Sequence, residues 1–560
     1  MKGLKHSSGM FGTRKKPEIW SGVSILLLLA FVVFLVYPLF ILIRLSVFNP
    51  EGRFTLDYFV KFLKTDYYVA TIGNSLKVTI AVTVMSLLVG IPMSYFYTFY
   101  QLKGKKLIFI LSILCCMSAP FLGAYSWIML LGRNGVITKF LETAFGLKIG
   151  SIYGFDGILL VQTLKFFPLV FIYMNGALKN IDNTLMEASA SMGCTGIKRL
   201  FGVVTRLVMP TMLAAALLVF MRAFADFGTP MVIGEGYSTF PVLIYNNYVG
   251  ETGSDYSFAA AISVIAIVIT TVIFLIQKWA TNKFDFALNA LHPVDPKKPK
   301  GIGGFLMHLY CYGVCALAFL PQMYIIYLSF RKCKGAVFQK GYSLGNYQAA
   351  AKQMLGRSIK NTVLLGGGGL VIIIILAVLI AYLVVRRRSL LNNTIDTLSM
   401  VPYIMPGVVI GIGLLSAFGK PPIVLTGSIT IMLIALVIRR LPYTIRSATA
   451  SLMQIPISME EASISLGASK MKTFMRITVP MMSPGIISGA ILSWVAIITE
   501  VSSAIILYNN KTITLTMSLY LAIYRGKDGM AAAFASVVTV VTIISLLIYL
   551  KVSKSEDIKL

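Results

Sequence analysis

Charged residues are scarce in this sequence, and acidic ones are the scarcest. Only 13% of the 560 residues are charged, about half the share of an ordinary soluble domain. Asp and Glu together number 21, against 50 Lys and Arg. A chain of this length with so few charges lacks the polar surface that a soluble globular protein needs, so the composition excludes that class.

Histidine and cysteine are too few and too scattered for a metal or catalytic centre. The three histidines, His6, His292 and His308, lie in unrelated segments. The six cysteines stand alone or inside apolar runs, where free Cys behaves as a small apolar side chain, and none has metal-ligand spacing. This argues against a membrane-embedded enzyme, and we expect no catalytic residue, metal or cofactor in this chain.

A phosphate-binding loop of the form G-x-x-x-x-G-K-[ST] is also missing from the sequence. The chain therefore cannot hydrolyse ATP alone, and an ATP-driven task would need a partner. The net charge of +29 does not indicate nucleic acid, because the basic residues sit in short gaps between apolar runs. Lys103, Lys105 and Lys106 form one such cluster, as expected of cytoplasmic loops in a membrane protein.

Hydrophobic residues make up 57% of the chain and are gathered into long runs. Helical runs of about 20 apolar residues match the thickness of the lipid bilayer. We therefore predict an all-α polytopic membrane protein with about twelve transmembrane helices. The predicted spans are 23–43, 78–99, 107–131, 158–178, 212–233 and 258–276, then 305–330, 363–385, 395–418, 423–438, 486–507 and 531–550.

An even number of spans places both termini on one side of the membrane. The basic clusters, including Arg386 to Arg388 and Lys297 to Lys300, then fall on that same side, which predicts cytoplasmic termini. Residues 283–300 are rich in proline and lysine and predict a cytoplasmic linker. The predicted division is a first transmembrane half at 1–282, the linker, and a second half at 301–560.

The two halves resemble one another in sequence. Glu187-Ala188-Ser189 recurs as Glu461-Ala462-Ser463, an offset of 461 − 187 = 274. The same offset joins further pairs: Gly193 and Gly467, Pro168 and Pro442, Lys198 and Lys472, Pro210 and Pro484, and Asp226 and Glu500. Six spans return the chain to its starting side, so we predict two parallel six-helix repeats related by an axis along the membrane normal.

A segment of mixed character separates the fourth and fifth spans of each half, at 181–210 and 455–480. Each begins with a turn-prone stretch and continues as a helix with Glu near its start, where the helix dipole favours an acid. A glycine, Gly193 or Gly467, then ends the helix. The pattern predicts two short helices on the cytoplasmic face. An amphipathic loop that merely rests on the lipid is the alternative, but two copies at matching positions argue against it.

Both segments resemble the cytoplasmic "EAA" loop of binding-protein-dependent ATP-binding-cassette importers. That pattern is Glu-Ala-Ala, three residues, Gly, and a run that ends in proline. Here Ser189 and Ser463 replace the second alanine, and Pro480 closes the second loop while Arg206 stands in its place in the first. The run LLGRNGVI at 130–137, the segment ADFGTP at 225–230 and the fused layout resemble ferric-iron-type permeases.

The resemblance implies a type I importer permease in a bacterial inner membrane, with several partners. Two copies of an ATPase subunit would bind ATP and Mg²⁺, and an extracytoplasmic binding protein would deliver the substrate. Contact with the ATPase is expected at Glu187, Ala188, Ser189 and Gly193 in the first loop, and at Glu461, Ala462, Ser463, Gly467 and Pro480 in the second. The substrate expected first is ferric iron or a ferric chelate, and the alternatives are a phosphonate, a sugar phosphate, thiamine or another small solute.

Asp226 and Glu500 are predicted inside the fifth span of each half, where a charge costs about 2.5–3.5 kcal/mol and needs a reason. Either they line the pathway between the halves, or Asp226 pairs with Arg222 and Glu500 is solvated near the outer surface. Lys165 and Arg439 match across the repeat and are predicted to extend toward the cytoplasmic surface. A secondary transporter with two six-helix halves remains a rival, although it would not need paired loops.

Overall fold

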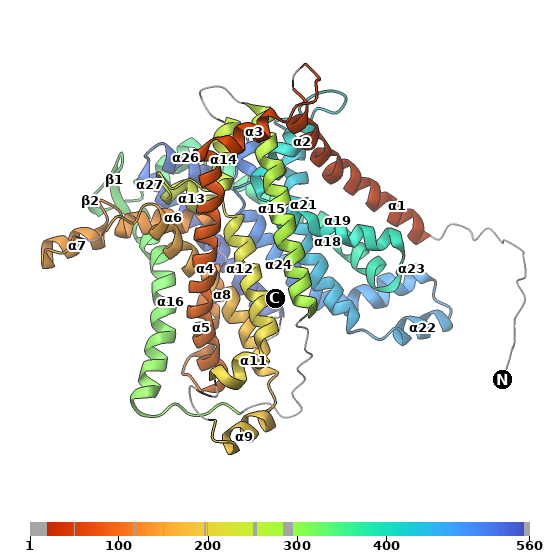
Figure 1. Ribbon diagram of the computed structural model, residues 1–560, viewed down its shortest axis with the longest axis horizontal. Helices are drawn as coiled ribbons and strands as arrows, with labels where there is room; N and C mark the ends of the chain where they lie inside the picture. The colour runs from red at the N-terminus through yellow and green to blue at the C-terminus, as the bar shows by residue number, and fades with distance from the viewer. Residues whose placement is uncertain are drawn as a thin grey trace, which may run out of the picture.

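The computed structural model describes residues 19–49, 51–116, 118–148, 150–194, 198, 200–249, 255–283 and 295–553. They form an almost entirely helical protein (Figure 1). The first half contains α1 (Ile19–Phe31), the π-helical turn η1 (Val32–Val36), α2 (Tyr37–Val47), α3 (Asp57–Lys64), α4 (Asp66–Phe99), α5 (Lys105–Cys116), α6 (Pro120–Leu131), α7 (Val136–Phe145), α8 (Phe155–Lys179), α9 (Asn183–Ser191), η2 (Leu200–Val204), α11 (Thr205–Leu207), α12 (Met209–Phe224), α13 (Gly228–Ile233), α14 (Phe240–Val249) and α15 (Tyr256–Lys283).

The second half follows a similar order, with a β-hairpin added and without a counterpart of α7. It contains α16 (Gly301–Ser329), β1 (Arg331–Lys334), β2 (Val337–Tyr342), α17 (Gly345–Gln353), α18 (Leu355–Arg386), α19 (Leu390–Ile404), α20 (Gly407–Ala417), α21 (Ile429–Met453), α22 (Ser458–Ser465), α23 (Lys470–Thr473), η3 (Phe474–Thr478), α24 (Val479–Ile498), α25 (Ala504–Leu507), α26 (Leu515–Tyr524) and α27 (Asp528–Ser553). The strands β1 and β2 pair antiparallel, with Arg331 opposite Tyr342.

The predicted fold class is confirmed. Eight of the described helices are long and apolar enough to cross a membrane, and two bent helix pairs bring the number to ten. The other two predicted spans correspond to α12 with α13 and to α21, which is 25 residues long but carries Arg439, Arg440 and Arg446. Each of the twelve predicted spans overlaps a helix or a bent pair, so twelve crossings are consistent with the structure.

The third and ninth spans were each expected to be one continuous helix, and the structure bends both sharply. The axes of Lys105–Cys116 and Phe121–Phe145 differ by 101°, and those of α19 and α20 by 113°. Both breaks fall at a residue that precedes a proline. Ala119 and Met405 have extended backbones, with ψ of 136° and 139°. Pro120 and Pro406 disfavour the helical conformation at the residue before them, so neither second helix can extend back through the break.

The predicted bounds of the tenth span, 423–438, were wrong. The helix α21 begins six residues later and continues to Met453. Its bounds lie 274 residues after those of α8 at both ends (429 − 155 and 453 − 179). The internal repeat therefore marked this helix more accurately than hydropathy, because its three arginines interrupt the apolar run.

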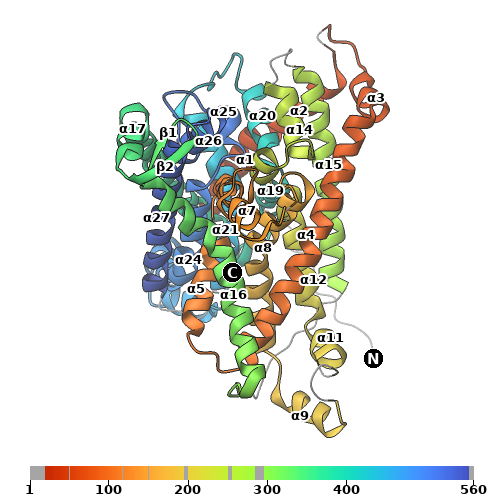
Figure 2. The same ribbon diagram turned by 90° about the vertical axis from the view of Figure 1, so that its left-hand side faces the viewer.

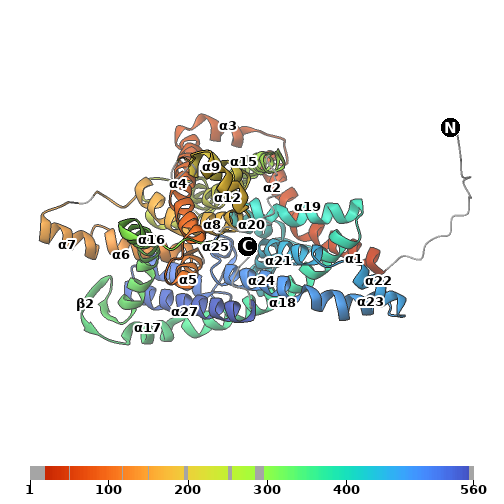
Figure 3. The same ribbon diagram turned by 90° about the horizontal axis from the view of Figure 1, so that it is seen from below.

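The first helix of each half packs against the opposite half. Helices α1 and α2 lie on α19 and α20, and α16 lies on α5 and α6. Figure 3 shows α1 beside α19, and Figure 2 shows α16 beside α5. The two six-helix repeats therefore interlock rather than sit side by side as separate units.

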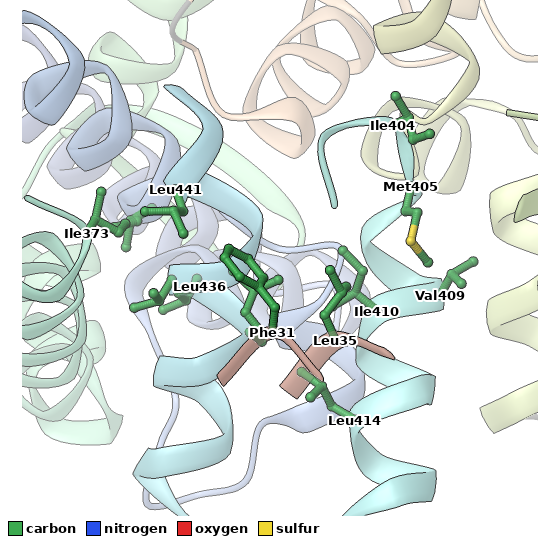
Figure 4. Packing of buried hydrophobic residues seen from close by; sticks show 14 of the residues in the cluster. Phe31, Leu35, Ile373, Ile404, Met405, Val409, Ile410, Leu414, Leu436 and Leu441 are labelled. Carbon is green, nitrogen blue, oxygen red and sulfur yellow. The ribbon is translucent and has the colours of Figure 1, made fainter. Parts of the chain in front are cut away.

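Buried apolar side chains fill the contact that α1 and η1 make with the second half. Figure 4 shows Phe31 and Leu35 surrounded by residues of α18, α20 and α21, among them Ile410, Leu414 and Leu436. All five of these side chains are nearly inaccessible to solvent. This core is continuous with that of the second half, so the first helix is part of the second half's packing.

One departure from symmetry is α7, which extends away from the body at the left of Figure 1. No helix stands between α20 and α21 in the second half. The extra segment explains why Pro406 lies 286 residues after Pro120 (406 − 120), whereas α21 lies 274 residues after α8. Most of the predicted linker, residues 284–294, lies outside the described residues.

The interlocking of the halves predicts a specific cross-link. A side chain at Gly413 would have its Cβ 3.6 Å from the Cβ of Pro38 on α2. With the native cysteines replaced, the double variant Pro38→Cys, Gly413→Cys should form a disulfide on mild oxidation, because this Cβ–Cβ distance suits two bridged cysteines. After cleavage at a protease site placed in the linker, gel electrophoresis should show the halves still joined. The Pro38→Cys variant alone should separate, and separation of both variants would contradict the exchange of first helices.

Candidate functional sites: the paired loops and the buried charges

The first loop is organised around the short helix α9. Asp182 caps its start, with its carboxylate accepting from the Thr184 backbone N–H at 2.9 Å. Glu187 is exposed and accepts from the Asn183 side-chain amide at 2.7 Å. Ser189 is buried and donates to the Met186 carbonyl at 2.8 Å. The helix is thus capped and satisfied locally, which leaves the glutamate at the surface.

The second loop, around α22, is tied more firmly to the membrane helices. Glu460 is buried and accepts from Arg386 at 2.9 Å, and the same guanidinium donates to the Ile455 carbonyl at 2.6 Å. Ser463 lies 2.9 Å from the Thr473 hydroxyl. The position of Glu460 corresponds to Met186 in the first loop, which is also buried. An ion pair therefore does in the second half what apolar packing does in the first.

Gly193 and Gly467 end the two loop helices with the same turn. Their φ angles are +76° and +86°. Gly193 donates to the Ala190 carbonyl, and the next residue, Cys194, donates to that of Ser189. Gly467 and the residue after it repeat this pair of bonds, which defines a Schellman C-cap. A Cβ at either glycine would meet nothing within 4 Å, so the backbone conformation alone demands glycine here.

Each loop exposes the same apolar stripe beside its glutamate. In the first loop it is formed by Leu185, Ala188 and Met192, whose spacing places them on one face of the helix. Met459, Ala462 and Leu466 repeat it at the 274-residue offset. Met192 and Leu466 are 86% and 89% exposed, among the highest values for large apolar side chains in the described residues. Figure 1 shows α9 at the lower edge of the molecule and α22 toward the right, well apart.

The segments after the two glycines differ. Pro480 lies in the first turn of α24, which continues the π-helical turn η3 without a gap. Arg206 lies in the three-residue helix α11, and α12 begins only after Val208, with Pro210 in its first turn. The second loop therefore leads into one continuous helix, whereas the first is interrupted.

Asp226 occupies a break between α12 and α13 and is almost fully buried. Its carboxylate accepts from the Thr229 hydroxyl at 2.7 Å and from the Gly228 N–H at 3.2 Å. The Lys165 ammonium lies 3.4 Å away and Gln162 3.2 Å away. The aspartate thus caps the second half of a broken helix and pairs with a cation on α8.

Glu500 occupies the matching break between α24 and α25. It accepts from the Ser503 N–H at 3.1 Å, and Ser503 corresponds to Thr229 in the first half. Its two oxygens form ion pairs with Arg439 and Arg440 on α21. The repeat therefore places an acid–base pair, Lys165 with Asp226 and Arg439 with Glu500, at the same point of each half.

The two alternatives to pathway lining and the expectation for Lys165 and Arg439 were wrong. Arg222 does not pair with Asp226, because its guanidinium points to Tyr443 of the second half, with 3.1 Å between Nη2 and the hydroxyl. Lys165 and Arg439 do not extend to the surface, since each has a buried carboxylate to neutralise. Glu500 is not solvated, with a side chain only 1% exposed. An unpaired charge is costly in the membrane interior. Each buried acid therefore has a basic partner close by, and the arrangements expected from the sequence do not form.

Comparison with known proteins identifies the family. The model of the family described as "Binding-protein-dependent transport system inner membrane component" matches residues 86–285 and 369–555. The chain belongs to this family. It is therefore a transport permease and a multi-pass inner-membrane protein, and its two matched segments are fused in one chain.

Several curated relatives resemble this permease along much of its length. The ferric transport system permease protein FbpB of Actinobacillus pleuropneumoniae is 30% identical over 535 residues, which cover 94% of this chain and 77% of the relative. The putative ferric transport system permease protein FbpB 1 of Haemophilus influenzae is 30% identical over 504 residues, 88% and 78% of the two chains. The putative 2-aminoethylphosphonate permease PhnU of Salmonella typhi is 25% identical over 272 residues, 48% of this chain and 92% of PhnU.

Sequence reasoning missed several residues of this permease. Arg386 was assigned only to a basic cluster, and Glu460 was passed over beside Glu461. Arg440 and Tyr443 have no polar counterpart at the 274-residue offset, where Phe166 and Leu169 stand. Because the repeat carries no signal for unmatched residues, only the arginine run within an otherwise apolar helix could have drawn attention to Arg440.

Loss of the Glu500 charge should destabilise the permease strongly. Glu500→Gln would leave Arg439 and Arg440 buried without a carboxylate, at a cost of about 3–5 kcal/mol. We expect a clear fall in the thermal unfolding midpoint in detergent. Glu461→Gln, at an exposed position, is the matched control and should leave the midpoint unchanged. Equal midpoints for the two variants would contradict the ion-pair assignment.

Proposed function

We propose that this permease forms the translocation pathway of an ATP-binding-cassette importer for ferric iron. One observation carries the coupling part of this proposal. The two loops share a capped helix, a glycine turn and an exposed apolar stripe beside a glutamate, although the rest of the sequence has diverged. Two identical contact surfaces on one chain suit two copies of the same partner. We infer that this partner is an ATPase subunit that binds ATP and Mg²⁺.

The exposed stripes explain how ATPase motion would reach the membrane. Met192 and Leu466 would insert in an apolar groove, and the small residues Ala188 and Ala462 would allow a close approach. Glu187 and Glu461 would face basic groups on the partner. In the second half the Arg386–Glu460 pair would pass a displacement of α22 directly to α18. The second loop would therefore be linked to the membrane helices more rigidly than the first.

Iron is favoured as cargo because two relatives that span most of this chain are named as ferric transport permeases. An extracytoplasmic binding protein would deliver it, in keeping with a family described as binding-protein-dependent. The basic clusters around α5 and the start of α16 favour a cytoplasmic position for that side and for both termini. A phosphonate is the second candidate, because PhnU, named as a putative 2-aminoethylphosphonate permease, matches about half of this chain.

Purification and uptake measurements test this proposal directly. The permease should co-purify with its ATPase in a complex that contains two ATPase copies for each permease, measured by native mass spectrometry. Proteoliposomes with this complex, ATP and the iron-loaded binding protein should accumulate ⁵⁵Fe. A complex that assembles and hydrolyses ATP but accumulates no iron would refute iron as the cargo while leaving the importer class intact.

The glycine turns should be essential for ATPase binding for a conformational reason. Gly193→Ala or Gly467→Ala forces a Cβ into the left-handed region, at a cost of about 1–2 kcal/mol each. We expect weaker ATPase co-purification, with Asn at either position milder than Ala because Asn tolerates this conformation. Gly146→Ala, at another open turn with φ of +64° and outside the loops, is the control and should have no effect. Normal ATPase co-purification with all the loop variants would contradict the assignment of these turns to the ATPase contact.

The apolar stripes should matter more than any single charge of the loops. Leu466→Asp or Met192→Asp would place a charge in a contact that excludes water, and we expect at least about tenfold weaker ATPase binding. Leu344→Asp makes the same change at an exposed residue outside the loops and should bind normally. Surface-immobilised ATPase would report the affinities. Normal binding by both loop variants would show that the stripes are not the docking surface.

A further inference from the structure

Six charged side chains lie at and near the contact between α12 of the first half and α21 of the second. Four are basic, namely Lys165, Arg222, Arg439 and Arg440, and two are acidic, namely Asp226 and Glu500. The carboxylates are only 5% and 1% exposed, and the paired basic side chains 12–15%. Arg439 lies within electrostatic reach of Asp226 and of Arg222, so these groups form one cluster rather than two separate pairs.

The two acids do not neutralise the four basic side chains, so the cluster keeps a net positive charge. Asp226 is matched by Lys165, and Glu500 is shared by Arg439 and Arg440. Within the part of the chain that the structure describes, the polar contacts of Arg222 are to neutral side chains. It donates to the Tyr443 hydroxyl and lies over that ring at 5.5 Å, and Tyr403 is a second tyrosine close by. In addition, the Nε–H of Arg440 is buried with no acceptor among the described residues.

This excess is located between the halves. Arg222 belongs to α12 of the first half, whereas Tyr443 and Tyr403 belong to α21 and α19 of the second. The Arg222–Tyr443 contact joins residues 221 positions apart. A solute that passes between the halves at this level must therefore separate or replace that contact, and it then meets the guanidiniums of both halves.

Excess positive charge in a membrane interior is costly unless an anion shares the space. The arginines of the two halves also repel one another, so the cluster by itself does little to hold the halves together. Guanidinium groups hold oxyanions through paired hydrogen bonds, which a hydrated metal cation cannot accept. A bare Fe³⁺ ion would meet repulsion from four cations here, and only two carboxylates would attract it.

We propose that the species that crosses between the halves is an anion, and that Arg222 and Arg440 bind its oxygen atoms. This rests on the proposed function in one respect, the choice of iron as cargo. Iron then crosses as a complex with an oxyanion, either phosphate or a carboxylate chelator, and the cluster rejects the free metal ion. A phosphonate, which is itself an anion, satisfies the same site.

Double-label uptake tests the proposal. Proteoliposomes with the permease, its ATPase and the binding protein loaded with ⁵⁵Fe³⁺ receive either ³²P-phosphate or ¹⁴C-citrate. We expect one of the anions to enter in a fixed ratio to iron, and which one enters identifies the oxyanion. Entry of iron without either label, at the same rate in the absence of both anions, would overturn the proposal. If iron does not enter but labelled 2-aminoethylphosphonate does, iron is the wrong cargo and the anion site stands.

A variant series separates anion binding from a purely structural role. Arg222→Gln should lower anion-dependent uptake by about tenfold, the effect of one lost ionic hydrogen bond, and Arg222→Lys should restore part of it. Arg446→Gln is the control, because this residue of α21 is half exposed and pairs with Asp396 at 3.5 Å rather than with a residue of the cluster. The decisive readout is the ratio of uptake with anion to uptake without it.

That ratio should fall toward one in Arg222→Gln and stay unchanged in Arg446→Gln. A structural role predicts something different: a lower thermal unfolding midpoint and equal losses of uptake with and without anion. That pattern, with no rescue by Arg222→Lys, would overturn the assignment.

Discussion

Burial of backbone and charge in the membrane interior is the constraint on which the rest of this structure depends. Backbone groups freed by a helix break have no water to bind at that depth, so a side chain has to satisfy them. Asp226 and Glu500 do this at the two breaks, where each accepts from an N–H at the start of the following helix. Their own charges then require cations, which α8 and α21 supply. The break, the acid and the base form a single unit that is repeated in each half.

The exchange of first helices makes the two units act together. Since α1 and α2 pack on the second half and α16 on the first, neither half can rotate without moving a helix of the other. The contact between Arg222 and Tyr443 crosses the same interface. In the proposed coupling, a displacement of the second loop would reach the charged cluster through the Arg386–Glu460 pair and the packing of α18 on α21.

The halves differ in the contacts made by their loops and by their buried acids. The first half has Met186 where the second has Glu460 paired with Arg386, and it has one cation near its buried acid where the second has two. Where the role is geometric the halves agree, as in the glycine turns at Gly193 and Gly467. Duplication thus preserved backbone conformation and changed the chemistry of the contacts, which gives one loop a stiffer link to the membrane helices than the other.

The sequence by itself determined the helical membrane class, the duplication and the positions of the loop glycines, because each is visible in the order of residues along the chain. The length of the apolar runs indicated the class, and the 274-residue offset indicated the duplication. A glycine after each short helix marked the end of that helix. The partners of the buried charges were decided only by tertiary structure. Lys165 and Asp226 are 61 positions apart, and Arg222 and Tyr443 are 221 apart. Nearest-turn reasoning paired Arg222 with Asp226, but the break after α12 turns the aspartate toward α8. Electrostatic energy in a medium of low dielectric constant depends on distance in space, and that distance exists only once the helices have packed.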